Sequence, residues 1–174
     1  SYNGQLMVMA NVHIGNYGTN NDEIESNSVK ISGLICKNFS FNHSRYGSNK
    51  SLFEFLSENK IVTISDVDTR ALVSYIRDNG SMNALITTDD IENIPELKKS
   101  LDKIPEMSGL ELASKVSTSK AYFYGNKNSK YKVAVLDLGV KANILKNLAN
   151  RNCFMKVFPH DSNFQDMLTW SPDA

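Results

Sequence analysis

The sequence has few of the features that mark a specialised chemistry. Only two cysteines occur in 174 residues, Cys36 and Cys153, and they stand far apart, so no CxxC pair, metal cluster or disulfide framework is predicted. Lysine plus arginine number 19, and so do aspartate plus glutamate. This zero net charge argues against binding to nucleic acid or to an anionic membrane. No apolar run approaches the roughly 20 residues that span a bilayer. No basic-then-apolar leader opens the chain, so we expect a cytoplasmic protein with reduced thiols.

What is present is typical of a globular α/β protein. Apolar residues make up 41% of the chain and charged residues 22%, which allows a sizeable core. Apolar spacing predicts strands over 5–12, 29–39, 61–64 and 82–87, of which 61–64 is expected to be short and buried. Helices are predicted after a capping box at Ser51–Glu54, over 66–80 between an Asp68 N-cap and a Gly80 stop, and on the surface over 93–105. The inward stripe of the second helix is predicted to be Ala71, Leu72, Tyr75 and Ile76.

The pattern changes after the polar stretch YGNKNSKYK, residues 124–132, which reads as a linker. The apolar run at 133–138 predicts a strand buried on both faces. A helix, a strand at 154–158 and a short helix capped by Ser162 follow. This order predicts the first βαβα units of a doubly wound parallel sheet, preceded by a mixed β/α domain. The domains are predicted to span 1–125 and 131–174. The inward residues of the helix after the first of these strands are predicted to be Ile144, Leu145 and Leu148.

The joint VAVLDLGVKANIL is the first candidate for chemistry. A dinucleotide site needs GxGxxG and a P-loop needs GxxxxGK[ST], whereas this joint has one glycine. Its helix N-terminus could bind an anion with help from Lys141. The favoured alternative is structural: Gly139 permits a tight turn, and the Asp137 carboxylate accepts from the free amides.

Other candidates also have a structural alternative. Asp66 and Asp68 could hold a metal or act as an acid–base pair, but carboxylates two residues apart at a strand end more often cap a helix. Arg70 would then neutralise one of them. His13 could be catalytic, but no orienting partner is visible, so a turn-stabilising role is favoured. His43 and His160 lie in polar loops and have no better claim.

A cysteine nucleophile would need small residues around it, as in GxCxG. Cys36 is predicted mid-strand in LICKN, and Cys153 is predicted to open a strand in RNCFM, so both are expected to be packing residues. No GxSxG occurs. The sequence therefore predicts no catalytic, cofactor-binding or metal-ligating residue.

Four stretches together resemble the small, glutamine-hydrolysing subunit of carbamoyl phosphate synthetase. They are HIGNYGTN, DVDTRALVSYIRDNGSMNALI, SGLELASKVST and VLDLGVKANILKNLANRNC. Their order and spacing match that family across nearly the whole chain. HIGNxGxN combined with DxDTR is specific, whereas either alone would be weak. The sequence departs from the family at Val12, where the family usually has proline, and at Lys146, where it often has arginine.

The resemblance implies that residues 1–125 are most of a domain that docks on the large synthetase subunit. Residues 131–174 would begin a class I glutamine amidotransferase domain. In the family, a cysteine thiolate assisted by a His–Glu pair attacks the amide of glutamine. The ammonia passes to the large subunit, which uses ATP and bicarbonate to make carbamoyl phosphate for pyrimidine and arginine biosynthesis. The resemblance implies that these catalytic groups lie after Ala174, and that a glutamine-contacting serine loop lies before Ser1.

We therefore expect a truncated small subunit that is inactive alone. It would form a heterodimer with the large subunit, handle glutamine only within the complete subunit, and bind no cofactor, nucleic acid or membrane. Two alternatives stay open. One is a non-catalytic interaction module of the same ancestry. The other is a small α/β nucleotide-binding protein, against which the missing glycine fingerprint counts.

Overall fold

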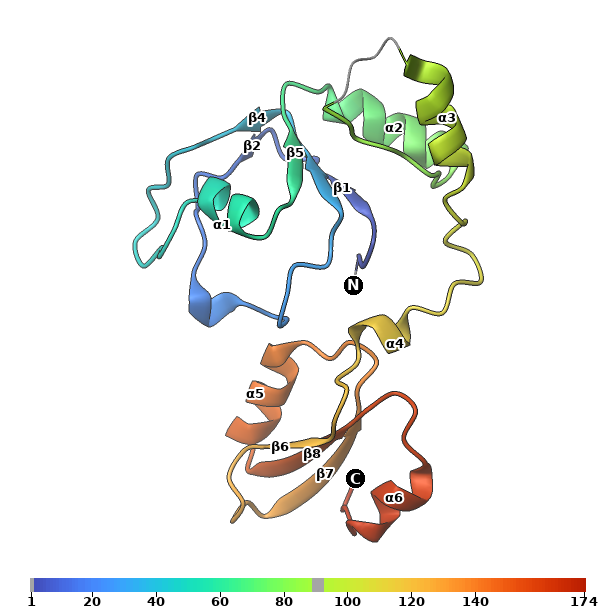
Figure 1. Ribbon diagram of the computed structural model, residues 1–174. Coiled ribbons are helices and arrows are strands. Elements are labelled where there is room, and N and C mark those ends of the chain that lie inside the picture. The colour runs from blue at the N-terminus through green and yellow to red at the C-terminus, as the bar shows by residue number, and fades with distance from the viewer. Residues whose placement is uncertain (1, 89–92) are drawn as a thin grey trace. The chain divides into compact units, whose positions relative to one another are not determined.

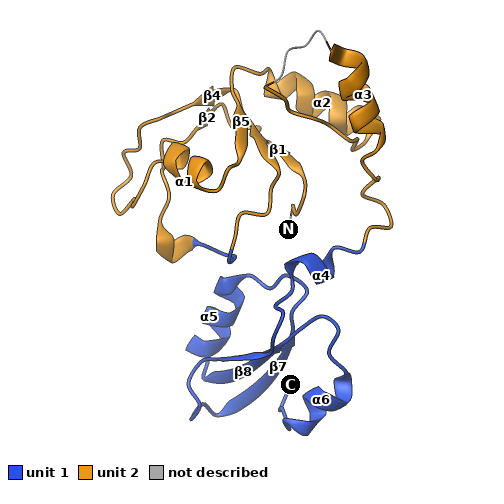
Figure 2. Cartoon of the chain, in the orientation of Figure 1, with its two compact units in different colours: residues 1, 24–27, 111–174 blue, residues 2–23, 28–110 orange. Residues whose placement is uncertain are grey.

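The computed structural model describes residues 2–88 and 93–174 (Figure 1). Its contacts group the described residues into two compact units (Figure 2). Unit 2 contains residues 2–23 and 28–110, and unit 1 contains residues 24–27 and 111–174. The short segment 24–27 therefore belongs to unit 1, although its neighbours in the chain on both sides belong to unit 2.

Unit 2 is built on a parallel sheet of three short strands. The strands are β1 (Leu6–Val8), β3 (Gly33–Ile35) and β5 (Val62–Ile64), in the order β1-β3-β5. A separate parallel pair joins β2 (His13–Ile14) to β4 (Asn38–Phe39). The prediction of one strand over 29–39 is thus wrong, because the pairing partner changes within it. The N–H of Cys36 donates to the carbonyl of Ile64, while that of Asn38 donates to the carbonyl of Val12.

The helix starts in unit 2 follow the predicted caps. Before α1 (Leu52–Glu58), Ser51 Oγ accepts from the N–H of Glu54, and the Glu54 carboxylate accepts from the N–H of Ser51. The helix α2 (Thr69–Asn79) is capped by Asp68 and ends at Gly80, whose φ is +85°. The surface helix α3 (Ile94–Asp102) is also confirmed, and a short 3₁₀ turn, η1, covers Asn21–Glu23.

Three predictions about burial and strands in unit 2 are wrong. β5 is an edge strand whose Val62 and Ile64 are 45% and 42% exposed, so it is not buried. Residues 82–87 form no strand, and Ile86 instead packs its side chain toward Gly33 of the sheet. In α2 the inward stripe includes Leu72 and Ile76 as predicted and the buried Thr69, but Ala71 and Tyr75 are exposed.

Unit 1 contains a mixed sheet with the strand order β6-β8-β7. The strand β8 (Cys153–Phe158) pairs antiparallel with β6 (Tyr122–Tyr124) and parallel with β7 (Tyr131–Leu136). The helices are α4 (Ala113–Val116), α5 (Ala142–Asn150) and α6 (Phe164–Thr169). The strand predicted at 154–158 is confirmed. The helix α6 is capped by Asn163, whose side chain accepts from the N–H of Gln165, and not by Ser162 as predicted.

The two faces of this sheet are covered by different helices. Leu145 of α5 packs against Met155 and Val157 to form the buried core. Phe154 alternates with these two residues along β8 and therefore lies on the other face of the sheet. There its ring contacts Trp170 at the end of α6, with the two ring centroids 5.9 Å apart. The predicted inward role of Leu145 and Leu148 is confirmed, whereas Ile144 is 50% exposed.

The polar stretch after β6 is a turn within unit 1. The Asn126 side chain accepts from the N–H of Asn128, and the Asn152 side chain accepts from the N–H of Lys130. Leu136 of β7 is 42% exposed, so this strand is not buried on both faces. The α/β fold class is confirmed. The compact units divide between residues 110 and 111, and the domain spans 1–125 and 131–174 stay predictions.

Candidate functional site: the β7–α5 turn and the α5 groove

The turn between β7 and α5 is organised by the buried carboxylate of Asp137. Its Oδ1 accepts from the N–H groups of Gly139 and Val140, each at 2.9 Å. Its Oδ2 accepts from the N–H of Thr118 at 2.7 Å. Gly139 has φ +99°, a conformation that glycine adopts without strain. The structural interpretation of this joint is therefore confirmed.

The N-terminus of α5 holds an anion that belongs to the chain itself. Oε2 of Glu25 accepts from the N–H of Asn143 at 2.9 Å, and the Glu25 carbonyl accepts from the N–H of Ala142 at 3.0 Å. Lys141 stands at the N-cap position and supplies no side-chain cap. No local pattern points to Glu25, since 118 residues separate it from its partner Asn143. The lysine at the cap position, which offers no acceptor, is a signal that could have pointed to an acceptor from a distant segment.

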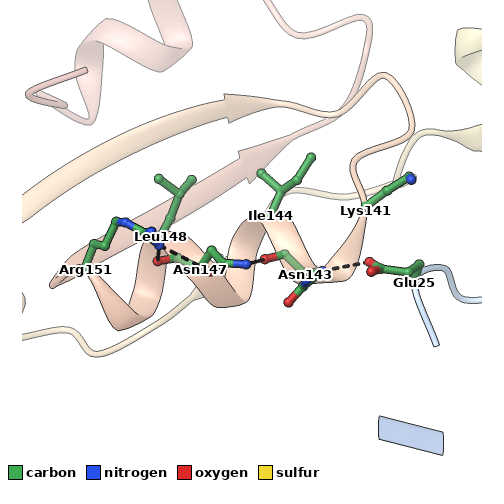
Figure 3. A pocket seen from close by; sticks show the side chains of 7 residues that line it. All are labelled: Glu25, Lys141, Asn143, Ile144, Asn147, Leu148 and Arg151. Atoms are coloured by element: carbon green, nitrogen blue, oxygen red, sulfur yellow. Dashed lines mark hydrogen bonds between the residues drawn. The ribbon is translucent and has the colours of Figure 1, made fainter. Parts of the chain in front are cut away.

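A shallow groove of about 510 Å³ runs along α5 from this cap (Figure 3). A ladder of side chains follows the helix, because Asn147 donates to the carbonyl of Asn143 and Arg151 donates to the carbonyl and side chain of Asn147. These groups bond within the helix and converge on no common point. The groove is lined by Glu25, Lys141, Asn143, Ile144, Asn147, Leu148 and Arg151.

Unit 2 has a smaller pocket of about 240 Å³ beside β5. Three aromatic rings line its rim in edge-to-face contact. The centroid of the Phe41 ring lies 5.3 Å from the ring centroids of both Phe39 and Phe53. Leu56 and Ile61 add apolar wall, and the hydroxyl residues Ser57, Thr63 and Ser65 complete the lining.

The structure supports the capping role of the second aspartate in DVDTR. Asp68 Oδ1 accepts from the N–H of Ala71 at 3.1 Å, as a helix cap does. Asp66 lies in a left-handed turn with φ +62°. Within the described ranges, Arg70 makes no ion pair with either aspartate, so its predicted neutralising role is wrong.

The histidines are dispersed. His13 starts β2 and is exposed, and in the part of the chain that the structure describes its side chain makes no hydrogen bond, so a turn-stabilising role for that side chain is not supported. His43 is exposed in a loop. His160 lies in unit 1, where its backbone N–H donates to Ser117 Oγ at 2.9 Å.

Both cysteines are buried packing residues, as predicted. Burial, and to a lesser degree the nearby Asp66 carboxylate, raises the pKa of the Cys36 thiol, so the reactive thiolate is disfavoured. Cys36 follows the last residue of β3 and does not lie mid-strand, whereas Cys153 does open β8.

Over residues 2–88 and 93–174, no three histidine, cysteine or acidic side chains come close enough to hold a metal ion. In the same ranges, no helix is both long and apolar enough to cross a membrane.

The HIGNYGTN stretch builds a loop against residues 45–50. The N–H of Thr19 donates to the carbonyl of Lys50, and Asn20 Nδ2 donates to the carbonyl of Gly47. A Cβ on Gly18 would meet the carbonyl oxygen of Lys50 at 2.7 Å, so only glycine fits there. The loop ends at Glu23, which forms a two-pronged ion pair with Arg45. This motif is therefore structural in unit 2.

Comparison with known proteins identifies relatives of the whole chain. Residues 1–86 match the family described as "Carbamoyl-phosphate synthase small chain, CPSase domain". The carbamoyl phosphate synthase small chain of Aquifex aeolicus is 37% identical over 187 aligned residues, which cover 100% of this chain and 50% of that protein. Those of Pyropia yezoensis and of Buchnera aphidicola subsp. Schizaphis graminum are each 38% identical and are covered to 49%. The chain spans about half the length of these relatives, and it belongs to the carbamoyl phosphate synthase small-chain family.

Proposed function

We propose that this chain is part of a carbamoyl phosphate synthase small subunit that hydrolyses glutamine and supplies ammonia to the large subunit. The observation that carries the proposal is the similarity to small chains over 100% of this chain. The product, carbamoyl phosphate, would serve pyrimidine and arginine biosynthesis in the cytoplasm. The partner would be the large synthetase subunit, in a heterodimer.

The chain by itself would be inactive as a glutaminase. Hydrolysis through a thioester needs a thiolate, a base to activate it and donors for the oxyanion. Cys36 is buried with a raised pKa, and Cys153 is buried at the start of β8. We also propose that the chain binds no cofactor of its own, since its strand-to-helix turn satisfies its amides with Asp137 and Glu25.

We further propose that residues 131–174 begin a doubly wound amidotransferase sheet. In such a sheet, helices cover both faces of the parallel strands. The parallel pair β7–β8, the α5 core on one face and the Trp170 contact on the other support this. The N–H of Asp173 donates to the carbonyl of Lys132, which places the chain after α6 beside β7. Residues 1–125 would carry the docking surface for the large subunit.

Two measurements test the proposal. Purified chain is mixed with the purified large synthetase chain of the same organism, and complex formation is followed by analytical ultracentrifugation. We expect a one-to-one complex. Glutamate release from glutamine is measured for the chain alone, and we expect none above the buffer rate. Turnover that disappears in Cys36→Ser or Cys153→Ser would show that the chain has its own nucleophile and would overturn the inactive assignment.

A further inference from the structure

We propose that residues 24–27 form a strap whose Glu25 clasps the first turn of α5, and that release of this strap unlocks the helix start and one end of the α5 groove. The need for a clasp follows from helix geometry. The first N–H groups of a helix have no acceptor within it, and a capping side chain normally supplies one. Lysine has no acceptor, so Lys141 cannot cap α5.

The clasp uses both parts of Glu25. The main-chain carbonyl takes the N–H of Ala142, and the carboxylate takes the N–H of Asn143. The negative carboxylate also lies at the positive end of the helix dipole, where it is favourable. Figure 3 shows this carboxylate at the start of the helix, joined by a dashed line to Asn143. A main-chain contact and a side-chain contact from one residue fix the strap in register with α5.

Two carboxylates divide the amides of the turn between them. Asp137 serves the amides before the helix and is itself buried. Glu25 serves the amides of the first helical turn, is exposed, and comes from a remote part of the sequence. An exposed contact between distant segments can open without exposing Leu145 or the residues it packs against. The clasp is therefore the part of the turn that can release independently.

Release has a local consequence for the groove. Glu25 and Lys141 line its end at the start of α5, and Arg151 lines the other end. When the strap leaves, the amides of Ala142 and Asn143 become free donors at that end. We therefore assign Glu25 as a positioning residue for the start of α5.

Amide exchange measured by NMR on the whole chain tests the strap. Glu25→Ala keeps the main-chain carbonyl and removes only the carboxylate. If the carboxylate is only a helix cap, its loss speeds amide exchange at Asn143 alone. If its loss releases the strap, exchange speeds up at both Ala142 and Asn143. The expected increase is about fivefold, which corresponds to the loss of a cap. We expect both amides to respond, and Glu25→Gln, which keeps a carbonyl acceptor, to restore both. Unchanged exchange at Ala142 in Glu25→Ala would overturn the strap.

A second variant removes the main-chain contact of the clasp instead of the carboxylate contact. Ala142→Pro removes the N–H that bonds the Glu25 carbonyl, and proline is tolerated at the first position of a helix. We expect faster exchange at Asn143 with an unchanged amide of Leu145, because the core stays closed. Glu106→Gln changes an exposed carboxylate in unit 2 and is the matched control, with no change expected at either site. If Asn143 exchanges at the same rate in Ala142→Pro as in the unmodified chain, the main-chain contact does not hold the strap and the proposal fails.

Discussion

Replacing Asp137 by alanine removes the acceptor of three backbone N–H groups at once. Two of these N–H groups belong to the β7–α5 turn and the third to Thr118. Their nitrogen atoms lie 2.7 to 2.9 Å from the carboxylate oxygens. A hydrogen bond to a charged group contributes roughly 1.5–3 kcal/mol, and part of this is recovered when the freed amides reach water. We therefore expect Asp137→Ala to lower the free energy of unfolding of unit 1 by about 3–4 kcal/mol.

The asparagine variant separates the two sides of the carboxylate. Asp137→Asn keeps one carbonyl oxygen, which can still accept from Gly139 and Val140, but it faces the N–H of Thr118 with an NH₂ group. The expected loss is about 1–2 kcal/mol. Asp161→Ala is the control, because this exposed carboxylate makes no hydrogen bond among the described residues, and a change under about 0.5 kcal/mol is expected.

The assay exploits the single tryptophan of the chain. Trp170 lies in unit 1 and contacts Phe123 and Phe154, so its fluorescence during urea unfolding follows that unit. Linear extrapolation then gives the free energy of each variant. If Asp137→Ala lies within about 0.5 kcal/mol of Asp161→Ala, these hydrogen bonds do not stabilise the turn and the reasoning is refuted.

Three further predictions concern unit 2. Gly18→Ala should lower the free energy of unfolding by about 2 kcal/mol or more, because its Cβ would clash with the Lys50 carbonyl oxygen. Gly47→Ala is also at positive φ, but its Cβ would meet only the Asn20 side chain at 3.9 Å, so it should cost about 1 kcal/mol. Urea unfolding followed by circular dichroism measures both. Hydrogen bonds from the N–H and hydroxyl of Ser51 lower the pKa of Glu54. The stabilising effect of this carboxylate is therefore full above about pH 4.3 and is lost as the pH falls through the lowered pKa. In Glu54→Gln, the free energy of unfolding should fall less steeply with decreasing pH in this acidic range. Burial raises the pKa of Cys36, so iodoacetamide at pH 8 should label it only after denaturation.

Each of these has a clear contrary result. Equal losses for the two glycine variants would mean that strain alone, and not the clash, restricts position 18. If the free energy of unfolding of Glu54→Gln falls with decreasing pH as steeply as that of the unmodified chain, the capping box does not cause this pH dependence. Rapid labelling of Cys36 in the folded chain would show that the strand end after β3 opens readily.

The sequence by itself determined the local features of this protein. The capping box at Ser51, the Asp68 cap and the Gly80 stop were predicted because each depends on residues within three or four positions. The Asp137–Gly139 turn was predicted for the same reason, since its acceptor lies two and three residues from its donors. The absence of a glycine fingerprint argued against a nucleotide-binding loop from the sequence alone.

Only the tertiary structure decided which face of each element is covered and which distant groups meet. Periodicity could not reveal that β5 is an edge strand or that Ile144 is exposed, because burial depends on what packs against an element and not on its own pattern. The pairing of β6 with β8 turned a predicted linker into a turn within unit 1. The Glu25 clasp joins residues 118 positions apart, and such a contact exists only once the chain has folded.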